Sequence, residues 1–186
     1  MALLTLIRMP RDGPMTPGES WGRVFRCHMP FRAGGELEEA VAEGVSTIVM
    51  LTSDAEAGQK VGRDLAAEYH ARGLERIHLP IVDFSTPDAT DLVPAVRAAA
   101  TRVRGEKTIL VHCSAGIGRT GMFLACLLRE LTGVDARVAI EHVRGFVAGA
   151  VETPDQVRAL SKASPLPPSS REESRQLISQ RIFPDS

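Results

Sequence analysis

The sequence has few of the features that mark secreted, membrane-bound or nucleic-acid-binding proteins. It contains three cysteines in 186 residues, which is no paired disulfide framework, so we expect a reducing compartment, the cytoplasm. No apolar run approaches the roughly 18 residues of a membrane-spanning helix, and residues 1–7 are too short for a secretory signal and lack its basic start. The net charge of −1 provides no basic excess for nucleic acid or an anionic membrane.

The sequence also lacks signs of a metal site, a repeat or a second domain. His70, His78 and His142 do not have metal-ligand spacing, so we expect no metal and no cofactor. The length suits one domain with a sizeable core, and we expect a monomeric unit over residues 1–163. A Pro- and Ser-rich segment then opens a C-terminal tail, residues 164–186. Within that tail, residues 171–183 fit either a short helix or an irregular segment.

Strand-like and helix-like segments alternate along the chain. We expect strands at 24–25, 45–51, 76–81 and 108–112, and helices at 36–43, 59–72, 89–104, 120–131, 135–147 and 154–162. This alternation predicts an α/β fold in which a central, mainly parallel sheet of four to five strands is flanked by helices. In such folds functional loops lie at the carboxyl ends of the central strands.

The most informative segment is His112–Thr120, which reads H-C-x-x-G-x-x-R-T between an apolar strand and a helix. Gly116 and Gly118 allow successive backbone N–H groups to point inward, and the helix adds its positive dipole end. Such a concavity suits a tetrahedral oxyanion such as phosphate. Cys113 lies at its base, where nearby positive charge favours the reactive thiolate.

Three further side chains of this segment fit the same chemistry. Arg119 can bind two phosphate oxygens with its planar guanidinium group, which a lysine cannot do with the same geometry. Thr120 places a hydroxyl group next to the sulfur. His112 precedes the cysteine and can hydrogen-bond to the loop backbone. The segment therefore predicts a cysteine nucleophile facing a bound anion.

These nine residues resemble the signature loop of the protein tyrosine phosphatase superfamily, and all nine match the sequence motif of its tyrosine-specific branch. The resemblance covers about residues 20–163 and implies the fold of that superfamily. It implies that Cys113 attacks phosphorus to form a phosphocysteine and that Arg119 binds the phosphoryl group and stabilises the transition state. Thr120 would stabilise the leaving thiolate in the hydrolytic step. The substrate-binding residues would be Ser114, Ala115, Gly116, Ile117, Gly118 and Arg119.

A phosphatase of this kind also needs a general acid, which later serves as a base for water. The segment Ile77–Asp88 runs from a short strand into a loop rich in Asp, Ser, Thr and Pro. It resembles the acid loop of small dual-specificity-like phosphatases, in which Asp83 takes the place of the acid. Asp88 is the alternative, although its position just before a helix suits an N-terminal cap.

The segment Val151–Gln156 opens the last predicted helix. Thr153 suits the N-cap, Pro154 the first helical position, and Gln156 completes a capping box. By resemblance, Gln156 also matches a glutamine that positions water in several small phosphatases. The Arg-Pro pair of that motif is replaced by Val147-Ala148, so a substrate contact from that arginine is absent. Both roles of Gln156 stay open.

Other residues near these motifs have two interpretations each. Cys126 lies in an apolar helical stretch and is expected in the core. Cys27 is either a packing residue or, as in some related phosphatases, a second cysteine that protects Cys113. A rim of the cleft or solvated surface is expected for Arg26, His28 and Arg32. Phe84 is either a wall for a substrate ring or a loop anchor.

The loop also carries information on the substrate. Ser114, Ala115 and Ile117 provide no lysine, whereas phosphoinositide-directed relatives often carry basic residues there, so a phosphoprotein is favoured. The match to the tyrosine-specific branch favours phosphotyrosine. The single tyrosine, Tyr69, lies in a predicted helix and provides no recognition loop, which suggests dual specificity. Alternatives are a phosphatase for a phosphoinositide, inositol phosphate or phosphosugar, a non-catalytic phosphate-binding adaptor, and a sulfur-transfer or arsenate-reducing enzyme.

Overall fold

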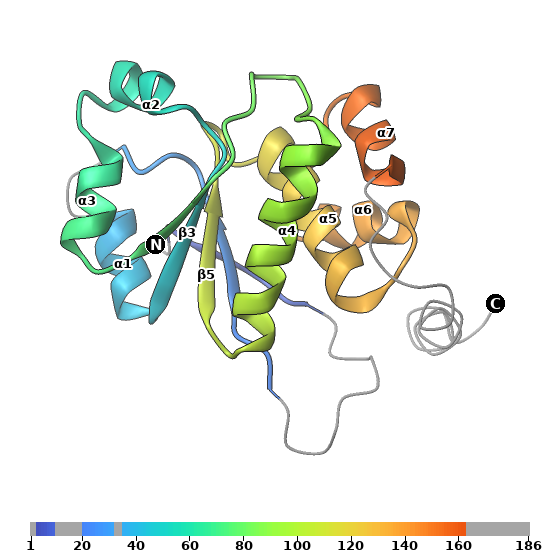
Figure 1. The fold of residues 1–186 in the computed structure, drawn as a ribbon, viewed down its shortest axis with the longest axis horizontal. Helices are drawn as coiled ribbons and strands as arrows, with labels where there is room; N and C mark the ends of the chain where they lie inside the picture. Colours follow the sequence, from blue (N-terminus) through green and yellow to red (C-terminus); the bar gives the residue numbers. More distant parts are fainter. Residues whose placement is uncertain (1–2, 10–19, 32–34, 163–186) are drawn as a thin grey trace.

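A five-stranded sheet organises the computed structural model, which describes residues 3–9, 20–31 and 35–162 (Figure 1). The strands are β1 (Thr5–Ile7), β2 (Val24–Cys27), β3 (Val45–Met50), β4 (Glu75–His78) and β5 (Thr108–His112). The helices are α1 (Glu36–Ala42), α2 (Asp54–Val61), α3 (Leu65–Ala71), α4 (Ala89–Arg104), α5 (Gly118–Thr132), α6 (Ala136–Arg144) and α7 (Pro154–Lys162). The predicted α/β class is confirmed. Arg32 and the predicted tail lie outside the described residues.

The strand order is β1-β2-β5-β3-β4, so β5 lies in the middle of the sheet. The pairs β2–β5, β5–β3 and β3–β4 are parallel, and only the described edge strand β1 is antiparallel to its neighbour. The central position of β5 explains its sequence, because a strand buried on both faces reads as a continuous apolar run.

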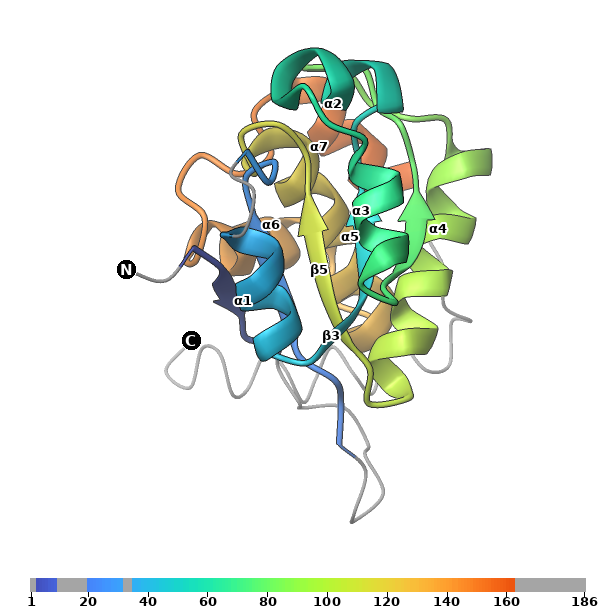
Figure 2. The same ribbon diagram turned by 90° about the vertical axis from the view of Figure 1, so that its left-hand side faces the viewer.

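Two hydrophobic cores lie on opposite faces of the sheet, and alternate residues of each strand enter one or the other. Val49 and Val111 pack with α4, α5 and α6, whereas Ile48 and Leu110 pack with α1 and α3. Figures 1 and 2 show α1, α2 and α3 on one face and the remaining helices on the other. Helix α5 is buried along nearly its whole length, because α4, α6 and α7 pack around it.

The structure corrects two sequence predictions. The apolar start of the chain was not predicted as a strand, yet Thr5–Ile7 pairs with β2. The single helix predicted at 59–72 is wrong, because the chain forms two helices there, α2 and α3. Gly62 ends α2 in the left-handed conformation with φ 71°, and the Asp64 carboxylate caps α3 by accepting from the Ala67 N–H at 3.0 Å.

Four connections meet at the carboxyl edge of the parallel strands. They follow β2 at His28, β3 at Leu51, β4 at Leu79 and β5 at Cys113. Beyond the end of β4, the Leu79 N–H donates to the carbonyl oxygen of Met50, the last residue of β3, at 3.0 Å, and the Ile81 N–H donates to that of Leu51 at 3.1 Å. The candidate site is therefore assembled from segments that are distant in sequence and adjacent at one edge of the sheet.

Candidate active site

A tight loop joins β5 to α5 and carries Cys113 at its start. Cys113 is 2% exposed, and the Gly116 N–H donates to its Sγ at 3.2 Å. Gly116 has φ 74°, and an added Cβ would collide with the Cys27 carbonyl oxygen, so both the conformation and the close approach require glycine. Arg26 Nη1 donates to the Gly116 carbonyl oxygen at 3.2 Å and fixes the loop from β2.

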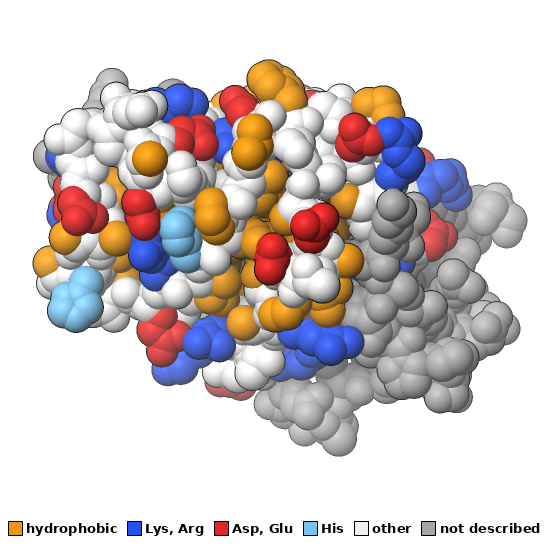
Figure 3. All heavy atoms as spheres, turned by 45° about the horizontal axis from the view of Figure 1, so that its top comes forward, with side chains coloured by type: hydrophobic (Ala, Val, Ile, Leu, Met, Phe, Trp, Pro, Cys, Tyr) orange, Lys and Arg blue, Asp and Glu red, His pale blue; other side chains and the backbone are white. Residues whose placement is uncertain are grey.

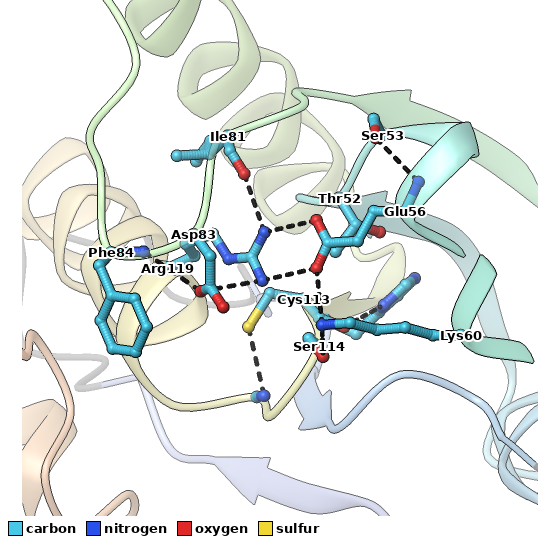
Figure 4. A network of polar contacts seen from close by, with 12 residues as sticks. Thr52, Ser53, Glu56, Lys60, Ile81, Asp83, Phe84, Cys113, Ser114 and Arg119 are labelled. Atoms are coloured by element: carbon cyan, nitrogen blue, oxygen red, sulfur yellow. Dashed lines mark hydrogen bonds and ion pairs between the residues drawn. The ribbon is translucent and has the colours of Figure 1, made fainter. Parts of the chain in front are cut away.

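Arg119, in the first turn of α5, is the most extensively paired side chain at this edge (Figure 4). Its Nη1 and Nη2 donate to the two carboxylate oxygens of Glu56 at 2.8 and 2.9 Å. Nη1 also donates to the Ile81 carbonyl oxygen at 2.8 Å, and Nη2 lies 3.1 Å from Asp83 Oδ1. Residues from the segment after β3 and from the segment after β4 thereby hold the guanidinium group in one orientation.

The pKa values of this pair shift in opposite directions. The hydrogen bonds from Arg119 hold the pKa of Glu56 below its ordinary value, against the effect of partial burial. Burial alone would lower the pKa of Arg119, but the hydrogen bonds to Glu56 and the neighbouring charges raise it. Both groups are therefore charged at neutral pH, and the pair is a bidentate ion pair.

Helix α2 brings Glu56 and one further charged residue to the loop. Ser53 caps the helix by accepting from the Glu56 N–H at 3.0 Å, which fixes the first turn. One turn later, Lys60 Nζ donates to Glu56 Oε1 at 3.1 Å and to Ser114 Oγ at 2.7 Å. The loop sequence contains no lysine, but Lys60 from α2 thus contacts Ser114, the residue that follows Cys113.

His112 supports the loop from below and is fully buried. Its Nδ1 lies 3.1 Å from the Cys113 carbonyl oxygen, which can only accept, so Nδ1 carries the proton. The Tyr69 hydroxyl group then donates to Nε2 at 2.8 Å. Burial lowers the pKa of His112 to about 4. The imidazole is therefore neutral, and the predicted contact with the loop backbone is present.

The connection after β4 places Asp83 and Asp88 differently. Asp83 contacts Arg119, whereas Asp88 occupies the N-cap position of α4, without a side-chain hydrogen bond to the helix. Phe84, beside Asp83, has φ 58°, a conformation that costs a non-glycine residue energy and is common at functional sites. Val82 and Phe84 are 79% and 64% exposed, so apolar side chains flank Asp83. In Figure 3, apolar and acidic side chains lie together in the middle of this face.

Gln156 is fully buried at the start of α7. Its N–H donates to Thr153 Oγ1 at 3.2 Å, and its Oε1 accepts from the Glu152 and Thr153 N–H groups at 2.8 and 3.4 Å. This is the predicted capping box. Its Nε2 donates to the Ser85 carbonyl oxygen at 3.5 Å, so the same side chain also ties α7 to the connection after β4.

The other two cysteines and His28 lie near the site or in the core. Cys27 is buried at the end of β2, and burial raises the pKa of its thiol. Cys126 is buried within α5, where burial raises the pKa to about 12. All three cysteines are free. His28 contacts the buried Glu36 carboxylate at 3.4 Å.

Several buried polar atoms at the carboxyl edge of the sheet have no hydrogen-bond partner. Among the residues that the structure describes, Arg119 Nε, Thr120 Oγ1 and Thr52 Oγ1 are buried without a hydrogen-bond partner. Within the same ranges, no cluster of three His, Cys, Asp or Glu residues could hold a metal ion. No helix in the described ranges is both long and apolar enough to cross a membrane.

Comparisons with known proteins agree with this geometry. A family model described as "Polymorphic toxin system, DSP-PTPase phosphatase" matches residues 29–132, more than half of the chain. The chain belongs to the DSP-PTPase phosphatase family. The crystal structure of Tk-PTP in the active form is 36% identical, with a TM-score of 0.67, over 80% of this chain and 97% of that one.

Two curated relatives are more distant in sequence. Cyclin-dependent kinase inhibitor 3 from Rattus norvegicus is 28% identical over 127 residues, 67% of this chain and 60% of its own length. Tyrosine-protein phosphatase cdcA from Emericella nidulans is 28% identical over 153 residues, 80% of this chain and 24% of its own. The chain thus spans about 60% of the first relative and about a quarter of the second.

The structure brings together most of the residues singled out from the sequence. Cys113, Arg119 and Asp83 meet at one edge of the sheet, with Gln156 attached through Ser85. Sequence reasoning missed Glu56 and Lys60. A capping pattern at Ser53–Glu56 could have revealed α2, but it carries no signal that links Glu56 to an arginine 63 positions away.

Proposed function

We propose that this chain is a cysteine-dependent protein phosphatase that hydrolyses phosphotyrosine, with phosphoserine and phosphothreonine as additional substrates. The observation that carries the proposal is the arrangement of donors around the Cys113 thiol. The Gly116 N–H faces the sulfur, and Arg119 Nε and Thr120 Oγ1 are buried without a partner among the described residues. Buried donors of this kind are expensive unless a ligand satisfies them, and a phosphoryl group suits them chemically.

In the first step, the Cys113 thiolate attacks phosphorus while Arg119 binds equatorial phosphoryl oxygens. An S–P bond forms, the P–O bond to the substrate breaks, and Asp83 gives its proton to the departing oxygen. The guanidinium group needs no reorganisation, because Glu56 and the Ile81 carbonyl already fix its orientation. A phosphoryl dianion would compete with Asp83 for Arg119 Nη2 and so free the acid for its task.

In the second step, Asp83 takes a proton from water as the water oxygen attacks phosphorus. The S–P bond breaks, inorganic phosphate forms, and the Thr120 hydroxyl group donates to the departing thiolate. Within the loop, backbone N–H groups from Ser114 to Gly118 provide the remaining donors. We assign His112 a supporting role, because its neutral imidazole is occupied by Tyr69 and by the loop carbonyl.

The protein substrate is supported by the relatives named as tyrosine-protein phosphatases and by the absence of lysine from the loop itself. A second candidate is a phosphomonoester on a lipid headgroup. It is favoured by a 30% identical relative, phosphatidylglycerophosphate phosphatase PTPMT2 from Arabidopsis thaliana, which aligns over 53% of this chain. It is also favoured by Lys60, which the fold brings to the loop.

The test is phosphate release by the wild type and Cys113→Ser in EDTA from matched phosphotyrosine and phosphothreonine peptides and from a phosphoinositide. We expect metal-independent release from the phosphotyrosine peptide that Cys113→Ser abolishes. The phosphothreonine rate then separates tyrosine-specific from dual-specific action. Release from the lipid alone would replace the substrate class, and tight phosphopeptide binding without any release would identify a binding module instead.

A further inference from the structure

A small charged network surrounds the mouth of the loop and is balanced without a ligand. Arg119 and Lys60 contribute two positive charges, and Glu56 and Asp83 contribute two negative ones. Both carboxylate oxygens of Glu56 accept from Arg119, so Glu56 alone would neutralise the charge of the guanidinium group. Lys60 contacts the same carboxylate at 3.1 Å. The ammonium group of Lys60 therefore makes the electrostatic potential more positive where α2 faces the loop.

The placement of Lys60 leaves its charge accessible. An ammonium group has three N–H donors, and Ser114 Oγ and Glu56 Oε1 occupy two of them. The side chain is 40% exposed, so the third donor can reach a bound molecule. Ser114 itself is fixed, because the Met29 N–H donates to its carbonyl oxygen at 2.8 Å. Lys60 and Ser114 thus form a prearranged pair directly beside Cys113.

The opposite end of the loop has the reverse charge. The exposed Glu152 carboxylate lies over Gly118, where an added Cβ would collide with it. In Figure 4, Lys60 and Phe84 lie on different sides of Cys113. The rim is therefore cationic towards α2, acidic towards the start of α7, and apolar at Val82 and Phe84. A substrate with an anionic group beside its scissile phosphate has one favourable orientation.

We propose that Lys60 and Ser114 form a subsite for a second anionic group, the carboxylate or phosphate of a residue neighbouring the scissile phosphotyrosine of a protein substrate. The inference rests on the proposed function and names a class of substrate within it. A peptide is favoured over an anionic membrane because the chain has a net charge of −1 and the rest of the rim carries the carboxylates of Glu152 and Asp83, which an anionic lipid surface would repel.

The experiment measures kcat/KM for two phosphotyrosine peptides that differ only by Glu or Gln next to the phosphotyrosine. For the wild type we expect the acidic peptide to be preferred about three- to fivefold, the scale of one partly exposed ion pair. Lys60→Met should bring the ratio to about one, and Lys60→Arg should restore most of it. Because the readout is a ratio, a general loss of activity in a variant does not affect it.

Lys107→Met is the matched control, since it removes the same charge from an exposed lysine next to the amino end of β5, far from Cys113. It should keep the wild-type ratio. A ratio near one in the wild type, or a ratio unchanged by Lys60→Met, would overturn the subsite while leaving the phosphatase proposal intact. No release from either peptide would instead count against the proposed function. Faster, Lys60-dependent release from phosphoinositide vesicles would replace the peptide by a lipid.

Discussion

Replacing Glu56 by Gln tests whether the orientation of Arg119 is set before substrate binds. The change keeps the shape of the side chain but removes its charge and sets an NH2 group against an Arg119 N–H. Removing one partner of a fully buried ion pair costs about 3–5 kcal/mol. The Arg119 side chain is 1% exposed but Glu56 is 21% exposed, so we expect a smaller loss of unfolding free energy, about 2 kcal/mol.

Glu56→Gln should also lower catalytic efficiency and oxyanion affinity in the folded protein. A guanidinium group that is free to turn loses its prearranged contact with phosphoryl oxygens, and misplacement of this kind costs about 10- to 100-fold in kcat/KM. Affinity for an oxyanion inhibitor such as tungstate should fall with it. The assays are denaturant unfolding, hydrolysis of a phosphotyrosine peptide and tungstate inhibition.

Glu68→Gln provides the control for Glu56→Gln. Glu68, on α3, is 23% exposed and pairs with Arg63 and Arg72 at 3.4 and 3.6 Å, so its ion pairs are separate from the Cys113 loop. It should lose stability without losing tungstate affinity. Tighter tungstate binding by Glu56→Gln would refute the reasoning, because Glu56 would then compete with the anion instead of orienting Arg119.

Two further predictions concern the acid and the buried imidazole. Asp83→Ala should slow release of a poor leaving group, such as a phenol of high pKa, about 100-fold more than release of p-nitrophenol, as expected for a lost general acid; Asp88→Ala should not. His112 is protonated more readily in the unfolded chain, where its pKa is near 6.5, than in the fold, where burial lowers it to about 4. Stability should therefore fall as pH drops from 6.5 to 4, by about 3 kcal/mol, and His112→Gln should remove that part of the slope.

A different result would refute each of these two predictions. The leaving-group pattern in Asp88→Ala but not in Asp83→Ala would move the acid to Asp88. For the imidazole, the quantity to compare is the difference in unfolding free energy between the wild type and His112→Gln across the pH range, since carboxylates contribute equally to both proteins below pH 5. A constant difference would mean that His112 titrates alike in the folded and unfolded chains.

The helices and strands that could be predicted from the sequence are those marked by the hydrophobic pattern of their own residues. Helices α4 and α7 and strand β5 have the predicted bounds, because their amphipathic or apolar runs are bordered by clear breaks. The loop from Cys113 to Arg119 was visible for the same reason, since a strand, two glycines and a helix start follow one another directly. Asp83 was favoured over Asp88 by its distance from a helix start, and the structure brings it to Arg119.

The residues that sequence reasoning missed depend on contacts between distant segments. Treating 59–72 as one helix hid the turn at Gly62 and the capping by Ser53, and with them the helix that carries Glu56 and Lys60. The absence of lysine from the loop was a correct observation, but α2 supplies a lysine from 54 positions away. Strand β1 was missed because a three-residue edge strand has no period to detect and depends on its pairing with β2.

The central claim is that Cys113 carries the phosphoryl group during turnover. The direct measurement is rapid acid quenching of the wild type mixed with a phosphotyrosine peptide carrying labelled phosphate, followed by mapping of the labelled cysteine. The account predicts a transient label on the peptide that contains Cys113, at a level approaching one per active site, and none in Cys113→Ser. Turnover of the same peptide with no protein-bound label, or with the label on another residue, would contradict it.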